Sequence, residues 1–244
     1  IKLFYFKRIL SISKEVFMND FLICNSLQKY WPNCSVDFSC SVPKGKTLVL
    51  FGHSGSGKST VLQMISGLVE PDNIDSKENP AKIYIDGKDC SKINPAKRDI
   101  GMVFQNAVLF PHLRVDDNVG YGLRCRGFSK KESRIMATEF LQKFNLEDFA
   151  TRDVTSLSGG EAQRVSLART LIVKPSLILF DEPFSALDKP LAKTLAQDIK
   201  KSQEELGFTS VLVTHDKEEA KFLGDYVIKM EKGKIIWQGS VNEF

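Results

Sequence analysis

Residues 52–60 combine glycines, a lysine and hydroxyl side chains at a spacing that could hold a polyphosphate. They match the pattern G-x-x-x-x-G-K-[ST], follow an apolar run and precede a helical pattern. Glycines let main-chain N–H groups turn toward phosphate oxygens, and a helix N-terminus adds positive potential. Lys58 would place its charge on the β- and γ-phosphates, and the Ser59 hydroxyl would be a ligand of Mg²⁺. The candidate phosphate-binding residues are Gly52, His53, Ser54, Gly55, Ser56, Gly57, Lys58, Ser59 and Thr60. Alone, this loop predicts a nucleotide binder and no particular reaction.

Two adjacent carboxylates, Asp181 and Glu182, follow the apolar run at 177–180. Strand ends face the ligand crevice in a parallel sheet, so both would reach a nucleotide. We expect Asp181 to hold Mg²⁺ through water and Glu182 to orient and deprotonate an attacking water. An acidic pair after a strand is more often a helix N-cap, but Pro183 and the phosphate loop favour the catalytic interpretation.

Two further features point to phosphate. Ser158, Gly159 and Gly160 stand at a predicted helix start, which forms a second anion-receiving N-terminus. His215 ends a later strand, where a neutral imidazole could contact a γ-phosphate. A lone histidine at a strand end is more often structural.

The elements that must position these residues alternate between strand and helix patterns, which is typical of an α/β domain. The patterns predict helices at 58–68, 129–144, from about 158, 190–206 and 217–223, with a polar loop at 71–80 and a hairpin around 232–233. Strands are predicted at 21–24, 35–42, 47–51, 82–85, 176–180 and 210–213. A helical insert at roughly 106–160 interrupts the nucleotide-binding core.

Composition excludes several classes of protein. The 244 residues are 42% hydrophobic and 26% charged, which is ordinary for a globular protein. The longest apolar runs are far shorter than the ~18 residues of a membrane-spanning helix. The net charge is +4, and basic and acidic residues are interleaved along the chain, so nucleic-acid binding is not expected. The five cysteines include no Cys-x-x-Cys pair, so a metal-binding framework is not expected either. Residues 1–17 are interpreted as an N-terminal extension without a secretory signal, with Met18 as an alternative start to Ile1.

With these motifs in order, residues 21–239 resemble the nucleotide-binding subunit of ATP-binding-cassette (ABC) transporters. The resemblance rests on the phosphate loop, Gln105, the LSGGE signature at 157–161, the acidic strand, the loop 185–188 and His215. It implies a P-loop NTPase core, a mostly parallel sheet with flanking helices, joined to an N-terminal antiparallel β subdomain and a helical signature subdomain. The nucleotide-binding domain would cover residues 18–244.

The resemblance also implies roles for single residues. Two cassettes would pair head to tail around two ATP, each phosphate loop facing the partner's Ser158, Gly159 and Gly160. Glu182 would be the general base and His215 would brace the γ-phosphate. Gln105 would sense Mg²⁺ and the attacking water, and Asp188 would communicate across the dimer.

An aromatic side chain about 20 residues before the phosphate loop normally stacks on adenine in this family. Tyr30 is the candidate and Trp31 is the alternative. The other interpretation of Tyr30 is an ordinary aromatic at a strand end.

The segment 97–123 resembles the importer branch that serves oxyanions, iron, polyamines, thiamine or sugars. There, Phe104, Phe110, Pro111 and Leu113 would receive a membrane permease, unless they form the core of the helical insert. The resemblance implies an ATPase on the cytoplasmic face of the inner membrane, bound peripherally to permease subunits and served by an external solute-binding protein. Its second cassette would be a copy of itself or a homologue. Alternatives are a DNA-repair or chromosome-type ABC ATPase and an exporter or lipoprotein-release ATPase.

Three departures from the family pattern stand out. Glu161 replaces the commoner glutamine of the signature, and ATPase activity is still expected with this replacement. The loop at 71–80 is longer than usual. No regulatory β-barrel domain follows in the given sequence, which favours short cassettes such as the molybdate or thiamine types. The sequence does not name the solute.

Overall fold

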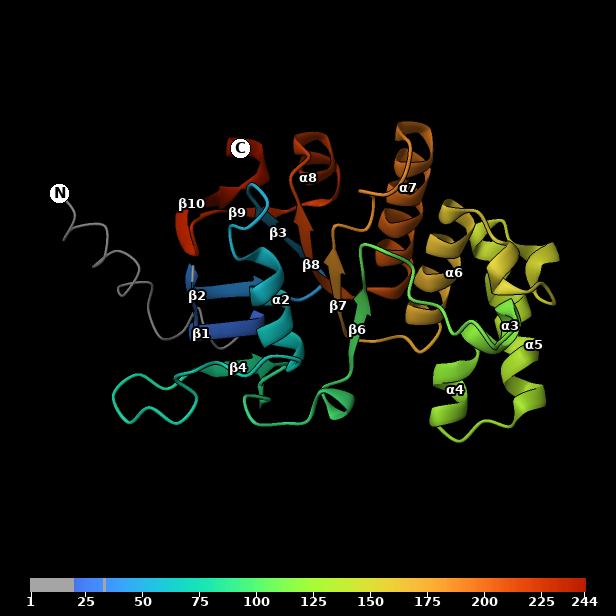
Figure 1. The fold of residues 1–244 in the computed structure, drawn as a ribbon, viewed down its shortest axis with the longest axis horizontal. Helices are drawn as coiled ribbons and strands as arrows, with labels where there is room; N and C mark the ends of the chain where they lie inside the picture. The colour runs from blue at the N-terminus through green and yellow to red at the C-terminus, as the bar shows by residue number, and fades with distance from the viewer. Residues whose placement is uncertain (1–19, 33) are drawn as a thin grey trace.

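Two sheets make up the part of the protein nearest the phosphate loop (Figure 1). The computed structural model describes residues 20–32 and 34–244. The extension predicted at residues 1–17 and the alternative start at Met18 lie outside the described residues. An antiparallel sheet has the order β2-β1-β4-β5, and a six-stranded sheet has the order β10-β9-β3-β8-β7-β6.

The strands of the antiparallel sheet are β1 (Asp20–Trp31), β2 (Cys34–Pro43), β4 (Lys82–Ile85) and β5 (Lys88–Asp89). Those of the larger sheet are β3 (Thr47–Phe51), β6 (Ile100–Val103), β7 (Leu177–Asp181), β8 (Thr209–Thr214), β9 (Tyr226–Glu231) and β10 (Lys234–Ser240). The strands β6, β7, β8, β3 and β9 are parallel, whereas β10 pairs antiparallel with β9. The carboxyl ends of these parallel strands therefore lie along one edge of the sheet.

Seven helices cover the described sheets and extend beyond them. They are α2 (Lys58–Ser66), α3 (Val115–Val119), α4 (Tyr121–Cys125), α5 (Lys130–Leu141), α6 (Gly159–Leu171), α7 (Lys189–Leu206) and α8 (Lys217–Leu223). Short 3₁₀ turns lie at Pro95–Lys97, Gln142–Phe144, Glu147–Phe149, Val154–Ser156 and Val241–Glu243. No helix within residues 20–32 and 34–244 is long and apolar enough to cross a bilayer.

Helix α2 lies between the two sheets, which explains its apolar composition. It contacts β1 and β2 on one side and β7 and β8 on the other. Val61, Leu62, Met64 and Ile65 are fully buried in the core formed there. A second core covers the opposite face of the large sheet and includes residues of α6 and α7. Because α2 is buried from two sides, its N-terminus, which follows the phosphate loop, is held in a fixed position.

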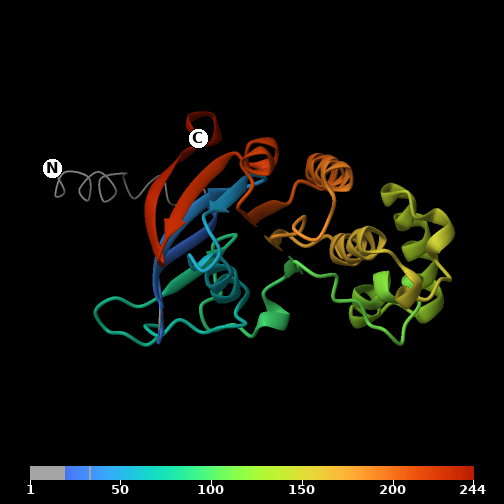
Figure 2. The same cartoon turned by 45° about the horizontal axis from the view of Figure 1, so that its top comes forward.

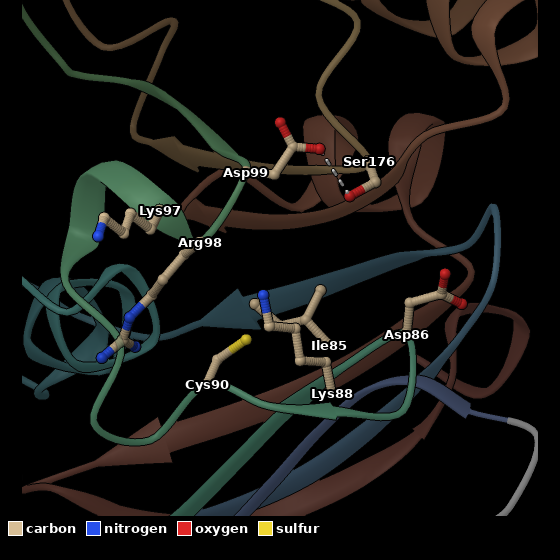
Figure 3. Close-up of a pocket in the computed structure, with 8 residues that line it drawn as sticks. All are labelled: Ile85, Asp86, Lys88, Cys90, Lys97, Arg98, Asp99 and Ser176. Atoms are coloured by element: carbon tan, nitrogen blue, oxygen red, sulfur yellow. Dashed lines mark hydrogen bonds between the residues drawn. The ribbon is translucent and has the colours of Figure 1, made fainter.

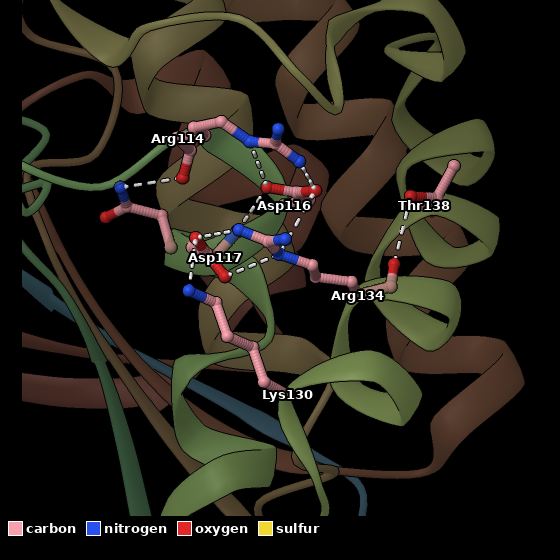
Figure 4. Close-up of polar contacts among 7 residues, drawn as sticks. Arg114, Asp116, Asp117, Lys130, Arg134 and Thr138 are labelled. Carbon is pink, nitrogen blue, oxygen red and sulfur yellow. Dashed lines mark hydrogen bonds and ion pairs between the residues drawn. The ribbon is translucent and has the colours of Figure 1, made fainter.

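Helices α3, α4 and α5 gather around α6, away from the antiparallel sheet (Figures 1 and 2). They lie within residues 106–160, and α6 begins at the end of that range. A cluster of ion pairs joins α3 to α5 (Figure 4). In it, Arg134 donates to both carboxylate oxygens of Asp117, at 2.9 and 2.7 Å, and Arg114 pairs with Asp116. Asp116 and Asp117 are 3% and 6% exposed, so their charges need these partners.

The structure corrects three secondary-structure predictions. Strand β1 continues to Trp31, whereas the pattern predicted its end at residue 24. A register shift between Cys24 and Leu27, where Ser26 has a φ of 52°, interrupts the alternation that marks a strand. Strand β6 was missed because it has only four residues, one of them Gly101. The short helices α3 and α4 were also missed. In α3 the buried positions include Asp116 and Asp117, so its buried face does not show as an apolar pattern in the sequence.

Candidate active site

The phosphate loop connects β3 to α2 at the carboxyl edge of the parallel strands. Gly57 is the N-cap of α2, with a φ of 97°, and it provides no side chain that could bond the first N–H groups of the helix. A Cβ built on Gly57 would lie 2.8 Å from the Val36 Cγ2, so only glycine fits between the loop and β2. The exposed main-chain donors of this helix end are suited to an anion.

The Lys58 side chain folds back over the loop. Its Nζ donates to the carbonyl oxygens of Gly52 and His53, at 2.8 Å each. Burial lowers the pKa of Lys58, while the nearby carboxylates of Glu182 and Asp181 act in the opposite direction. The ammonium group is therefore held at the loop with acidic groups nearby.

Ser59 and Asp181 meet although 122 residues separate them in the sequence. The Ser59 Oγ donates to the Asp181 Oδ1 at 2.9 Å. Burial is the main cause that raises the pKa of Asp181, and Glu182 raises it further, whereas the Ser59 hydrogen bond and Lys58 lower it. A hydroxyl and a carboxylate oxygen at this spacing are hard donors of the kind that Mg²⁺ prefers, so the predicted pair fits that ion.

Glu182 has an unusual main chain. Its φ is 46°, in the left-handed region that non-glycine residues seldom adopt. Its N–H donates to the Val213 carbonyl at 3.1 Å, and its own carbonyl accepts from the Ser185 N–H and Oγ. Its Oε2 lies 3.4 Å from the Nδ1 of His215. The structure thus brings Glu182 and His215 together from the ends of β7 and β8.

Gln105 follows β6 on the same edge of the sheet. β6 pairs with β7 in parallel, Val103 opposite Phe180, so Gln105 follows β6 next to the end of β7 at Asp181. The Gln105 side chain is exposed. Within the part of the chain that the structure describes, it makes no hydrogen bond to Ser59 or Asp181.

The signature residues lie apart from the phosphate loop of the same chain. Ser158 is the N-cap of α6, and its hydroxyl accepts from the Glu161 N–H while the Glu161 carboxylate accepts from the Ser158 N–H. Glu161 therefore completes a capping box, which explains how it fits at this position. Helix α6 belongs to the core on the face of the sheet opposite α2. Figure 1 shows α2 and α6 on different sides of the parallel strands.

Asp188 is the N-cap of α7, and its Oδ1 accepts from the Leu191 N–H at 3.0 Å. A Cβ on Gly160 would overlap the Leu191 side chain, so the start of α6 packs against the start of α7. The signature and Asp188 are thereby held together.

Tyr30 and Trp31 end β1, and both side chains are exposed. Tyr30 is the cross-strand partner of Ser35 on β2. The Ser35 carbonyl lies against Gly233, whose N–H donates to the Ser56 carbonyl of the phosphate loop at 3.0 Å. The strand end is therefore near the phosphate loop, which is where an adenine-stacking side chain is needed.

The hairpin between β9 and β10 supports the phosphate loop, and the sequence analysis gave it no such role. Besides bonding Ser56, Gly233 accepts a hydrogen bond from the Asp37 N–H of β2 at 2.9 Å. A Cβ on Gly52 would overlap the Met230 carbonyl oxygen. The Lys232-Gly233 turn was visible in the sequence, but its contact with the loop is set by tertiary packing.

A cavity of about 220 Å³ lies at the opposite end of the parallel strands, beside Asp99 and Ser176 (Figure 3). Its wall includes Arg98, whose guanidinium donates to the carbonyls of Met64 and Ile65 at the end of α2, and to those of Ser91 and Ile93. Arg98 thus stabilises α2 at its C-terminus, and the cavity is separate from the predicted site.

The aromatic segment after Gln105 is at the surface. Phe104 is 37% exposed, Pro111 is exposed, and Phe110 and Leu113 are half-buried outside the described cores. The alternative that these residues form the core of the helical insert is therefore wrong. Asn118, fully buried, accepts from the Phe110 N–H and donates to the carbonyls of residues 110, 113 and 114, which fixes the loop.

Comparison with known proteins gives close relatives. The family model described as ABC transporter matches residues 36–185. Over 227 residues the chain is 42% identical to the "Fe(3+) ions import ATP-binding protein FbpC" of Pasteurella multocida, covering 92% of this chain and 63% of that protein. It is 40% identical over 224 residues to the "Sulfate/thiosulfate import ATP-binding protein CysA" of Synechocystis sp., covering 91% and 61%. The chain thus spans less than two thirds of the length of these relatives.

A solved structure of a dimeric ATP-binding cassette in a post-hydrolysis state, bound to ADP and phosphate, matches with a TM-score of 0.78 and 31% identity. The match covers 91% of this chain and 100% of the other. The predicted fold class, a P-loop core with an antiparallel β subdomain and helices, is confirmed. The chain belongs to the ABC transporter family.

Proposed function

We propose that the chain is the ATP-hydrolysing subunit of an ABC importer. The observation that carries this proposal is the meeting of Lys58, Ser59, Asp181, Glu182 and His215 at the carboxyl edge of one parallel sheet. The relatives named for iron and sulfate import fall within the solute group that segment 97–123 predicts. The nucleotide-binding domain would comprise residues 18–244, with its helical subdomain at roughly 106–160.

ATP would bind with its phosphates on the main-chain donors of the loop and on Lys58. Ser59 and Asp181 would hold Mg²⁺, with Gln105 facing it. When bound, Mg²⁺ neutralises charge on the phosphate oxygens. Glu182 orients a water for in-line attack on the γ-phosphorus and takes its proton, as the bond to the ADP oxygen breaks and phosphate leaves.

A second cassette would complete each site. Ser158 lies at the start of α6, on the other face of the sheet from α2, so a single chain does not bring the signature to its own phosphate loop. A second copy or a homologue, packed head to tail, would supply Ser158, Gly159 and Gly160. Asp188 would lie at the seam because its helix packs against the start of α6.

The transport partner would dock on the surface after Gln105. Phe110, Pro111 and Leu113 are presented there on a loop that Asn118 fixes, and Phe104, directly before Gln105, is held through its carbonyl by Gln163. We assign this surface to permease subunits at the cytoplasmic face of the inner membrane, with an external solute-binding protein supplying the solute.

Two measurements test the proposal. The purified chain should hydrolyse ATP only with Mg²⁺, and it should copurify in stoichiometric amount with a multi-span permease from native membranes in mild detergent. The permease would identify the solute. Absence of Mg²⁺-dependent hydrolysis would overturn the enzymatic part. A soluble chromatin or repair partner without a membrane protein would favour a non-transport ABC ATPase.

A further inference from the structure

The long loop at 71–80 takes the place of a strand along the second half of β1. Strand β4 pairs with β1 only from Leu22 to Asn25, which leaves the edge of residues 26–30 without a strand on that side. Asp72 and Asn73 of the loop form hydrogen bonds with this edge. The Asp72 N–H donates to the Gln28 carbonyl at 2.8 Å, and the Tyr30 N–H donates to the Asp72 Oδ2 at 2.7 Å.

Asn73 continues the same pattern with its side chain. Its Oδ1 accepts from the Gln28 N–H at 3.2 Å, and its Nδ2 donates to the Ser26 carbonyl at 2.7 Å. The same Nδ2 donates to the Asn79 carbonyl at 2.8 Å, and the Asn73 carbonyl accepts from the Ala81 N–H. The loop is thus closed on itself and held to β1 by side-chain amide groups.

Asp72 also forms an ion pair with Lys29, whose ammonium group lies over the Trp31 ring. The Lys29 Nζ lies 2.5 Å from the Asp72 Oδ1 and donates to the Glu70 carbonyl, and it stands 5.4 Å from the centre of the Trp31 ring. The Lys29 hydrogen bond and then the Tyr30 N–H hold the pKa of Asp72 below its usual value. One carboxylate therefore fixes both the main chain of Tyr30 and the cation over Trp31.

We propose that Asp72 is a positioning residue for the nucleotide base, because it holds the end of β1 at which Tyr30 and Trp31 present their rings. This inference rests on the proposed function. The other restraints at this strand end are its pairing with residues 34–36 of β2 and a hydrogen bond from the Tyr30 hydroxyl to the Gln28 Oε1 at 3.2 Å, and both rings are exposed. Without Asp72, the main chain of Tyr30 and the cation over Trp31 lose a shared anchor, and the strand end that carries both rings is less well fixed.

The test compares Asp72→Ala with Asp75→Ala. Asp75 lies in the same loop and pairs with exposed Lys92, and its carboxylate makes no hydrogen bond or ion pair to β1 among the described residues. Steady-state hydrolysis gives KM and kcat for ATP, and inhibition by inorganic tripolyphosphate, which has no base, gives Ki. For Asp72→Ala we expect KM to rise about tenfold, as for loss of a charged hydrogen bond, with kcat and Ki unchanged. Asp75→Ala should match the unaltered chain.

A conservative variant separates positioning from general support. Asp72→Asn keeps an oxygen for the Tyr30 N–H and should restore most of the affinity. The inference is overturned by an unchanged KM, by a parallel rise of KM and Ki, or by an equal loss in Asp75→Ala. A chain that hydrolyses no ATP even when unaltered contradicts the proposed function instead, so the two failures are distinguishable.

Discussion

The His215 Nδ1 lies 3.4 Å from the Glu182 Oε2, at the ends of two neighbouring parallel strands. Glu182 reaches this position with a main chain in the left-handed region, which costs about 1 kcal/mol or more for a residue with a side chain. The hydrogen bonds to Val213 and from Ser185 maintain it. Backbone strain of this kind is concentrated at functional sites, which supports the general-base role proposed for Glu182.

Replacing Glu182 by Gln should leave ATP binding intact and reduce turnover by about a hundredfold or more, because the amide cannot accept the proton of the attacking water. Binding of a fluorescent ATP analogue and release of phosphate measure the two effects. His215→Ala serves as a comparison, since it removes the neighbour and leaves the base. Undiminished hydrolysis by Glu182→Gln would exclude the general-base role.

Lys58→Ala should lose affinity for the nucleotide itself. The ammonium group is buried in the loop and donates to the carbonyls of Gly52 and His53, which places its charge where a phosphate would bind. Removing a charged donor of this kind should weaken binding by about tenfold or more. Equilibrium titration with ATP checks this, and tight binding by the variant would contradict the phosphate-cradle assignment.

Asp181→Asn should stabilise the ligand-free chain while abolishing Mg²⁺-dependent hydrolysis. Burial raises the pKa of Asp181, so the charged form is disfavoured in the folded state. Its contribution favours folding at low pH and is lost as pH rises from the unfolded pKa through the folded pKa. The amide keeps an oxygen for Ser59.

The variant should therefore melt about 2 °C or more higher at pH 7, and the difference should shrink near pH 4. Thermal melting at both pH values, without Mg²⁺, measures it. A lower melting temperature for Asp181→Asn at pH 7 would mean that the Ser59 hydrogen bond to the carboxylate outweighs the desolvation.

The local chemistry of the site was predictable from sequence, whereas its support was not. Lys58 opens the helix after β3 and Asp181 ends β7, so residue type and spacing predicted that both would lie at one edge of the sheet, as the structure places them. The contact of Gly233 with Ser56 joins segments 177 residues apart and has no local pattern. The second half of β1 was missed because the register shift between Cys24 and Leu27 breaks the alternation of the strand, and Asp72 and Asn73 bond that half from a distant loop.

The ion cluster of the helical region makes a stability prediction. Asp117 is almost fully buried and accepts two hydrogen bonds from Arg134, which hold its pKa below the usual value. Asp117→Ala should lower the free energy of unfolding by about 2 kcal/mol, since Arg134 loses two charged hydrogen bonds and keeps only an ion pair with Asp116 at 3.8 Å. A folded pKa below the unfolded one means that this contribution is present above the unfolded pKa and is lost as pH falls.

Urea denaturation at pH 7 and at pH 4 checks both statements for Asp117. Asp148→Ala is the matched control, because Asp148 is exposed in the same region. An effect of equal size in the control, or one that grows as the pH falls, would show that the cluster does not stabilise the helices in this way.

Gly233→Ala tests whether the β9–β10 hairpin sets the phosphate loop. Gly233 has a φ of 78°, and an added Cβ would overlap the Ser35 carbonyl oxygen, so the turn must move away from β2 and from Ser56. Gly87→Ala is a matched control: its φ is 74°, but a Cβ there would meet no described atom within 4 Å. Both variants carry the backbone strain of about 1 kcal/mol, and only the first carries the overlap. We therefore expect Gly233→Ala to weaken ATP binding several-fold beyond its loss of stability, and Gly87→Ala to lose stability alone. Equal ATP affinity in the two variants, measured at a temperature where both are folded, would mean that the hairpin does not position the loop.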